Sequence, residues 1–357
     1  MLRRFLIFSF SAITAINALG CTSAIIGAEA SLSGRPLLWK HRDTGTEHNF
    51  VARVDRQGQI PYVALFNGGD SLLAEAWMGL NAEGFAIMNT ASYNLAPDTA
   101  SYKDREGYLM SEALAKCSTL RDFENLLDSL PKPMGVQANF GVIDASGAGA
   151  YYETDDYRYT KYSIDDTPDK LLLRTNYSCS GDSTCGMGYI RYQNAVTLLS
   201  PHIKARNITP ATFTEELSRS FYHSLLGRDP MADGDSWAID QDFIPRRSSS
   251  ASIVIEGIRP GESPTLSVMW TAIGYPPCAT VIPVTVDSVP DRLQPLAHLW
   301  RCPECDYTLT LKRLAFPITR GSGRHYIDLD ALRPIIRERH QKSEATYRRF
   351  REKSTDK

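Results

Sequence analysis

The stretch that organises this chain is Ala18-Leu19-Gly20-Cys21-Thr22-Ser23. Small residues stand three positions and one position before Cys21, which is the pattern that a signal peptidase cuts. A cut there makes Cys21 the first residue, so that it carries both a thiol and a free α-amino group. The reference pKa of an α-amino group, about 7.7 to 8.0, suits a general base near neutral pH. We therefore expect Cys21 to be an N-terminal nucleophile.

The residues before this junction resemble an export signal. Arg3 and Arg4 precede an apolar run over residues 5–16, which is shorter than the roughly 20 residues that cross a bilayer. No later segment approaches that length, so we expect no membrane span. We predict that residues 1–20 form a signal peptide and that the mature protein is exported, to the periplasm or outside the cell.

A lipoprotein signal is the alternative interpretation of the same junction. It also places a cysteine after a glycine, and it would lipidate Cys21 and consume the amine, leaving a non-catalytic binding protein at the membrane surface. That signal prefers a larger aliphatic residue where Ala18 stands. The small-residue pattern therefore favours a free Cys21.

The composition is that of a globular protein. Of 357 residues, 43% are hydrophobic, and the formal net charge is −2. These values allow a sizeable core and give no electrostatic reason to expect nucleic acid as a partner. No low-complexity linker divides the chain, so we predict one domain over residues 21–330 and a basic, charged, solvated helix or tail over residues 331–357. The sequence leaves the oligomeric state open.

Seven cysteines are an odd number for an exported chain. An unpaired Cys21 leaves six, among which Cys179 and Cys185 are the favoured disulfide pair. Cys302 and Cys305 form a Cys-Pro-Glu-Cys motif that resembles half of a zinc ribbon. Because no second such motif follows and a structural zinc site normally needs four ligands, we favour a local disulfide or two free thiols over a metal site.

The mature chain begins with a predicted β-hairpin. Residues 21–28 are small and β-branched, a turn follows, and residues 36–39 resume an apolar strand that leads into Lys40-His41-Arg42-Asp43. An antiparallel pairing brings Lys40 and Asp43 back beside Cys21. A cation and a carboxylate at that distance would bias the thiol and the amine.

The remaining pattern alternates between groups of strands and groups of helices. Thr119 is expected to cap a helix that ends before Pro131, and Thr209 is expected to cap another over residues 210–226. Asn89 and Asn176 each follow a predicted strand. The grouping suggests segregated layers rather than alternating βαβ units. Strands are expected at 49–54, 61–66, 74–80, 85–88, 140–144, 150–153, 157–162, 171–174, 251–255, 266–273 and 279–286, and a further helix at 187–199.

Several of these motifs resemble the N-terminal-nucleophile (Ntn) hydrolases of the linear-amide class. That class includes choloylglycine hydrolases, penicillin V acylases, isopenicillin N acyltransferase relatives and peptidase C45-like enzymes. The matching motifs are Cys21-Thr22-Ser23, Lys40-His41-Arg42-Asp43, Gly79-Leu80-Asn81-Ala82-Glu83-Gly84 with Asn89, Thr175-Asn176, Arg191, Ile244-Pro245-Arg246 and the turn within Trp270–Pro277.

The resemblance implies an α+β fold, an αββα four-layer sandwich of two antiparallel sheets between helices, and no metal or organic cofactor. It also implies that Cys21 attacks a linear amide and forms a thioester, with its own α-amine as general base. Asn89 and Asn176 would donate hydrogen bonds to the oxyanion, and Asp43 would hold the amine. Lys40 and Arg191 would favour the thiolate.

Two positions depart from the family pattern. Lys40 stands where bile-salt hydrolases have Arg, and His41 replaces the usual Asn. Lys keeps the positive charge but lacks the guanidinium fork, so bile-salt specificity is not predicted.

The acyl group of the substrate is not defined by the sequence. Trp39, Trp77 and Tyr93, together with Phe50, are candidates to line an apolar pocket for a small-molecule amide. The alternatives to a hydrolase are an acyltransferase or an N-terminal-cysteine dipeptidase on the same fold, and the lipidated binding protein described above.

Overall fold

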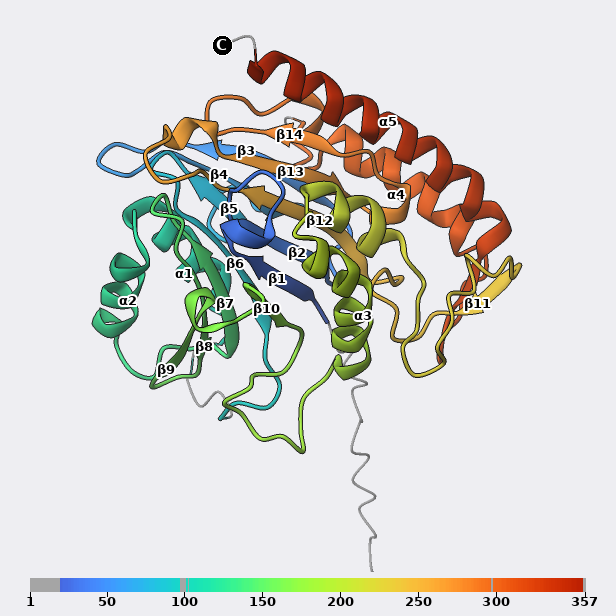
Figure 1. Ribbon diagram of the computed structural model, residues 1–357, viewed down its shortest axis with the longest axis horizontal. Coiled ribbons are helices and arrows are strands. Elements are labelled where there is room, and N and C mark those ends of the chain that lie inside the picture. Colours follow the sequence, from blue (N-terminus) through green and yellow to red (C-terminus); the bar gives the residue numbers. More distant parts are fainter. Residues whose placement is uncertain (1–19, 97–100, 102, 297, 356–357) are drawn as a thin grey trace, which may run out of the picture.

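Two antiparallel sheets stacked face to face form the centre of the molecule (Figure 1). The computed structural model describes residues 20–96, 101, 103–296 and 298–355, so most of the predicted signal peptide lies outside the described residues. The six-stranded sheet has the order β10 (Leu171–Arg174), β1 (Thr22–Ile26), β2 (Leu37–Asp43), β12 (Ser249–Glu256), β13 (Val268–Ile273) and β14 (Ile282–Val284). The seven-stranded sheet runs from β3 (Asn49–Val54) through β4 (Tyr62–Asn67), β5 (Met78–Asn81), β6 (Ala86–Ala91), β7 (Ala138–Ile143) and β8 (Gly149–Thr154) to β9 (Tyr159–Ser163).

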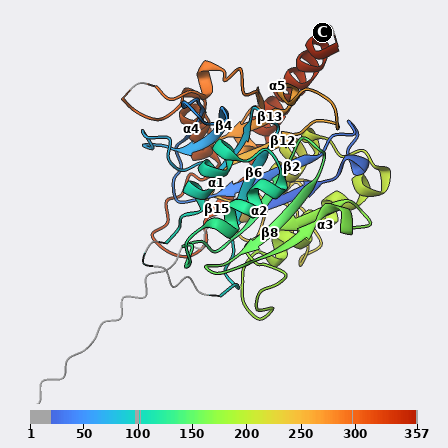
Figure 2. The same cartoon turned by 90° about the vertical axis from the view of Figure 1, so that its left-hand side faces the viewer.

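Helices cover the outer faces of both sheets. Helices α1 (Glu106–Lys116) and α2 (Leu120–Ser129) lie against the seven-stranded sheet, on the side that Figure 2 turns toward the viewer. Helix α3 (Tyr189–Ala205), the short helices η3 (Thr212–Glu216) and η4 (Leu217–Arg219), and α5 (Leu329–Thr355) cover the six-stranded sheet, with α4 (Pro303–Ala315) beside α5. The predicted α+β, αββα sandwich is confirmed. A small sheet of β11 (Trp237–Ile239) and β15 (Tyr326–Asp328) completes the described strands.

Strand β2 separates two cores because successive side chains point to opposite faces of a sheet. Leu38 belongs to the core between the two sheets, whereas Leu37 and Trp39 belong to the core under the helices. The same alternation continues toward the end of the strand. It sends Lys40 and Arg42 to the inner face, and His41 and Asp43 to the outer face.

The predicted hairpin at the start of the mature chain is confirmed. Strands β1 and β2 pair antiparallel with Thr22 opposite His41 and Ser23 opposite Lys40. The predicted cap is confirmed as well: Thr119 and Asp122 form a reciprocal capping box at the start of α2. These features depend on local sequence, which is why short patterns were sufficient to predict them.

Two helices differ from the sequence prediction. The prediction of one helix over residues 210–226 is wrong in length. Only the short helices η3 and η4 form there, and the chain then turns. Helix α4 was missed, although Pro303 at its first position is a recognisable start signal. All seven cysteines are free thiols, so the favoured Cys179–Cys185 disulfide is absent from the structure. Within the described ranges, no cluster of His, Cys, Asp and Glu side chains is suited to hold a metal ion.

One side of helix α5 is buried rather than solvated. The Tyr347 ring lies 4.4 Å from that of Trp270 on β13, and the Ser343 hydroxyl accepts a hydrogen bond from the Val281 amide at 3.1 Å. The segment expected to be a solvated tail is therefore anchored on the six-stranded sheet. No helix among the residues described has the length and apolar character needed to cross a bilayer.

Candidate active site

Cys21 lies immediately before β1 and borders a cavity of about 690 Å³. Its side chain is nearly buried, and its thiol lies 3.8 Å from the carbonyl oxygen of Asp43, within hydrogen-bond range for sulfur. The cavity brings together six of the nine residues singled out from the sequence. These are Cys21, Lys40, Asp43, Trp77, Asn89 and Tyr93.

Two guanidinium groups hold the backbone carbonyl groups of Gly20 and Cys21. Arg246 donates a 2.7 Å hydrogen bond to the carbonyl oxygen of Gly20, and Arg191 donates to that of Cys21. A Cβ atom at position 20 would lie 2.6 Å from Nη2 of Arg191 and 2.7 Å from Nη2 of Arg246. Real Cβ contacts are not this short, so the residue before Cys21 has to be a glycine while both arginines keep these positions.

Asp43 is buried and fully engaged. Its carboxylate accepts a 2.6 Å hydrogen bond from the Ser249 hydroxyl and forms an ion pair with Arg246. Ser249 is the first residue of β12, where it lies opposite Asp43 on β2, and Arg246 lies in the segment that leads into β12. Arg246 was quoted from the sequence only as part of a family-like motif, and Ser249 was missed, because no local pattern shows which strand will lie beside β2.

His41 supports Asp43 from the same face of β2. Its Nε2 lies 2.8 Å from the Ser249 hydroxyl, and its Nδ1 lies 3.1 Å from the Ser218 hydroxyl. Burial lowers the pKa of His41 to about 4, so the ring is neutral near pH 7. Because the Ser249 proton goes to a carboxylate, which only accepts, Nε2 of His41 must carry the ring proton and Nδ1 must accept.

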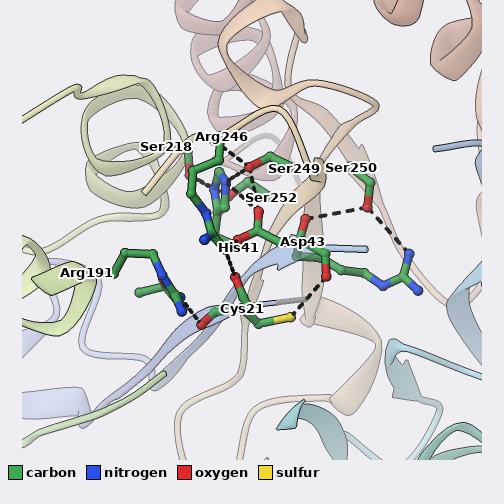
Figure 3. A network of polar contacts seen from close by, with 12 residues as sticks. Cys21, His41, Asp43, Arg191, Ser218, Arg246, Ser249, Ser250 and Ser252 are labelled. Carbon is green, nitrogen blue, oxygen red and sulfur yellow. Dashed lines mark hydrogen bonds and ion pairs between the residues drawn. The ribbon is translucent and has the colours of Figure 1, made fainter. Parts of the chain in front are cut away.

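The hydrogen-bond chain continues outward through Ser218 and Ser252 (Figure 3) and ends at Trp39. The hydroxyls of Ser218 and Ser252 are 2.7 Å apart, and the indole Nε1 of Trp39 donates to Ser252 at 3.0 Å. An indole only donates, so every bond from Trp39 to Asp43 runs in one direction. The prediction that Trp39 lines the cavity is wrong. Its ring is fully buried on the outer face, stacked on Phe213 at 4.8 Å. Phe50, the further aromatic candidate, is buried in the inner core.

Lys40 fixes the orientation of Asn89. The Lys40 ammonium donates to Oδ1 of Asn89 at 2.7 Å and to the carbonyl oxygen of Trp77 at 2.8 Å. Burial lowers the pKa of Lys40 to about 7. With Oδ1 held by Lys40, the amide nitrogen of Asn89 is directed away from that ammonium and has no hydrogen-bond partner among the residues that the structure describes. A preoriented donor of this kind can stabilise an oxyanion.

Asn176 is committed to other groups. Its Oδ1 accepts from Nη2 of Arg191 at 2.8 Å, and its Nδ2 donates to the carbonyl oxygen of Ala91 at 2.8 Å. Arg191 in turn donates to the hydroxyl of Thr22 at 2.9 Å. Arg191 therefore holds the backbone at Cys21, and Asn176 holds Arg191. Of the two asparagines, Asn89 has the geometry that better suits an oxyanion donor. A role for Asn176 as a second donor stays a prediction.

Comparisons with known proteins were made at the level of sequence and of structure. No protein-family model matches the sequence, and no curated protein matches it. Solved structures similar to this chain include a Caenorhabditis elegans ortholog of N-acylethanolamine-hydrolyzing acid amidase, with 13% identity, 66% of this chain and 92% of that chain covered, and a TM-score of 0.44.

Two bacterial structures are similar to the same degree. A variant of conjugated bile acid hydrolase from Clostridium perfringens has 9% identity, covers 76% of this chain and 94% of its own, and gives a TM-score of 0.46. Penicillin V acylase from Agrobacterium tumefaciens has 11% identity, covers 75% of this chain and 87% of its own, and gives a TM-score of 0.44. Because all three scores are below 0.5, the function of this chain is argued from its own residues.

Proposed function

We propose that this protein is an exported cysteine hydrolase that cleaves a linear amide bond through a thioester on Cys21. One observation carries the proposal: a thiol at the border of a cavity lies beside a buried Asp43–Arg246 pair and a preoriented Asn89 amide. Activity requires that residues 1–20 are removed, because the α-amine of Cys21 is tied up in a peptide bond until then.

The chemistry follows from these groups. The α-amine of Cys21 takes the thiol proton, directly or through water, and the sulfur attacks the carbonyl carbon of the amide. The oxyanion accepts a hydrogen bond from the Asn89 amide, a type of contact whose loss costs roughly 100- to 1000-fold in rate. The C–N bond then breaks, the amine leaves with the proton, and water hydrolyses the thioester to release the acid.

Asp43 and Arg246 act on the amine rather than on the substrate. In the described chain Arg246 binds both the Gly20 carbonyl oxygen and Asp43. Removal of Gly20 frees that donor and leaves the Cys21 amine close to a fixed carboxylate. An ammonium or amine held by Asp43 keeps its orientation toward the thiol, which is what a general base requires.

The experiment is a turnover assay on a panel of N-acyl amides with the exported protein. We expect acid release by the wild type and none by Cys21→Ala. Cys179→Ala is the matched control, because it removes an exposed thiol outside the cavity and should keep full turnover. Unchanged turnover in Cys21→Ala would reject Cys21 as the nucleophile. Added amines would compete with water for the thioester if the protein is an acyltransferase.

A further inference from the structure

The buried arginines of this protein fall into two groups. A buried cation is costly unless it is paired, and four buried or largely buried arginines follow that rule, each with a carboxylate on another side chain. These pairs are Arg174 with Glu153, Arg219 with Glu215, Arg339 with Glu338 and Arg246 with Asp43.

Arg42 does not follow that rule. It is 4% exposed, and its guanidinium donates to two amide oxygens, Oδ1 of Asn49 at 2.6 Å and Oδ1 of Asn67 at 2.8 Å. Within the described part of the chain, no carboxylate lies within ion-pair distance of Arg42. Arg191 also lacks a carboxylate, but its charge is used on the carbonyl oxygen of Cys21. The charge of Arg42 has no comparable role toward the Cys21 backbone, and Arg42 lines the cavity that Cys21 borders.

Lys40 repeats the pattern two residues earlier on the same face of β2. In the described part of the chain, its hydrogen bonds go to neutral oxygens, those of Asn89 and Trp77. Both cations lie near the Trp77 ring, with Cζ of Arg42 at 5.0 Å and Nζ of Lys40 at 5.9 Å from its centre. The indole Nε1 of Trp77 is buried and has no partner among the described residues. This wall of the cavity therefore offers positive charge, and it includes an indole whose N–H is unpaired among the described residues.

We infer that the wall formed by Lys40, Arg42 and Trp77 binds a carboxylate of the substrate. The inference rests on the proposed function and names its substrate class: amides that carry a carboxylate, on either the acyl chain or the amine. A guanidinium fixed by two asparagines is preorganised for a carboxylate, and such charge-assisted hydrogen bonds are stronger than neutral ones.

The acidic side chains near this wall do not form ion pairs with its cations. Asp43 is engaged by Arg246, and an oxygen of Glu106 accepts a hydrogen bond from the Gln137 amide at 3.0 Å. Burial lowers the pKa of Arg42 to about 10, and the nearby Cys21, Asp43 and Glu75 oppose this shift only in part, from beyond ion-pair distance. Lys103 and Asp104 also border the cavity. The wall itself presents two cations and no anion.

The test measures selectivity with matched amides on the exported protein. Glutaryl- and pentanoyl-7-amido-4-methylcoumarin differ by a carboxylate on the acyl chain, and N-phenylacetylglycine and N-phenylacetylethylamine differ by one on the amine. We expect a preference of about 10-fold in kcat/KM for the carboxylate in at least one pair. We expect Arg42→Gln to abolish that preference and Arg42→Lys to keep part of it. Arg121→Gln, which changes an exposed arginine on α2, should keep it fully.

A binding measurement separates this inference from the proposed function. Calorimetry on Cys21→Ala should show glutarate binding that glutaramide does not match and that Arg42→Gln loses. Cys21-dependent hydrolysis of both members of each pair at equal rates would overturn the inference and leave the hydrolase standing. If no amide is hydrolysed, the proposed hydrolase function is rejected. Equal calorimetric binding of glutarate by the Cys21→Ala protein with and without Arg42→Gln would overturn the inference as well.

Discussion

The two faces of strand β2 show opposite ways of burying polar groups. On the outer face, His41 and Asp43 belong to a hydrogen-bond chain in which each donor has an acceptor. On the inner face, Lys40 and Arg42 are buried cations whose described partners are neutral. The hydrogen-bond chain from Trp39 to Asp43 closes without a ligand, whereas the inner face lacks an anion. We propose that the outer face positions Cys21 and that the inner face binds the substrate.

The largest effect on stability and turnover should come from a substitution of Asp43 on the outer face. Asp43→Asn keeps the shape but leaves the Arg246 charge buried without its partner, which costs about 3–5 kcal/mol of unfolding free energy. It also removes the charge that holds the Cys21 amine, so we expect kcat/KM to fall roughly 100-fold or more. Urea unfolding and amide turnover measure the two effects.

Glu215→Gln is the matched control for Asp43→Asn. It breaks the buried Arg219–Glu215 pair, which lies outside the cavity lining. We expect it to lose comparable stability but to keep its turnover while folded. Equal loss of turnover in both variants would reduce Asp43 to a structural role.

Lys40 on the inner face should make the free energy of unfolding depend on pH. The folded pKa of Lys40 is about 7, well below its ordinary value of 10.5, because burial disfavours the charged form. Below pH 7 both folded and unfolded states hold the proton, and the full cost of burial is present. Between pH 7 and 10.5 the folded state has released the proton and the unfolded state still holds it. The contribution of Lys40 to the free energy of unfolding therefore rises by about 1.4 kcal/mol per pH unit.

Lys40→Met removes this dependence. In urea unfolding between pH 6 and 9, the wild type should gain stability relative to Lys40→Met above pH 7, since the other titrating groups are common to both. Parallel curves across that range would show that the Lys40 ammonium is not desolvated as the structure implies.

His41 allows a finer test of the outer face. The amide nitrogen of Gln in His41→Gln can take the place of Nε2 and donate to Ser249, whereas the shorter Asn in His41→Asn cannot reach it. We expect kcat to fall about 10-fold in His41→Asn, in line with one lost buried hydrogen bond, and less in His41→Gln. Similar losses in both variants would show that the link from His41 to Ser249 does not position Asp43.

The smallest effect should come from the outer end of the chain. Trp39→Phe keeps the ring stacked on Phe213 and removes the hydrogen bond to Ser252. We expect a loss of about 1 kcal/mol in urea unfolding and less than about a twofold change in kcat. A change in kcat as large as that of His41→Asn would show that the whole chain, rather than His41 alone, determines the position of Asp43.

Local patterns predicted the hairpin that brings Cys21 beside β2 and the segregation of strands from helices, whereas the two-sheet sandwich was predicted from the family resemblance. They did not predict the partners of Asp43, because Ser249 lies 206 residues further along the chain and is brought there by the pairing of β12 with β2. The error at Trp39 was avoidable in principle. Side chains alternate along a strand, so Trp39 and its neighbour Lys40 point to opposite faces of β2.

The central claim is that Cys21 becomes a free N-terminal residue, and the intact mass of the exported protein tests it most directly. We predict a single species that begins at unmodified Cys21. A species that retains Gly20, or one that carries a diacylglyceryl group on Cys21, would contradict the account, because neither form presents the thiol together with a free α-amine.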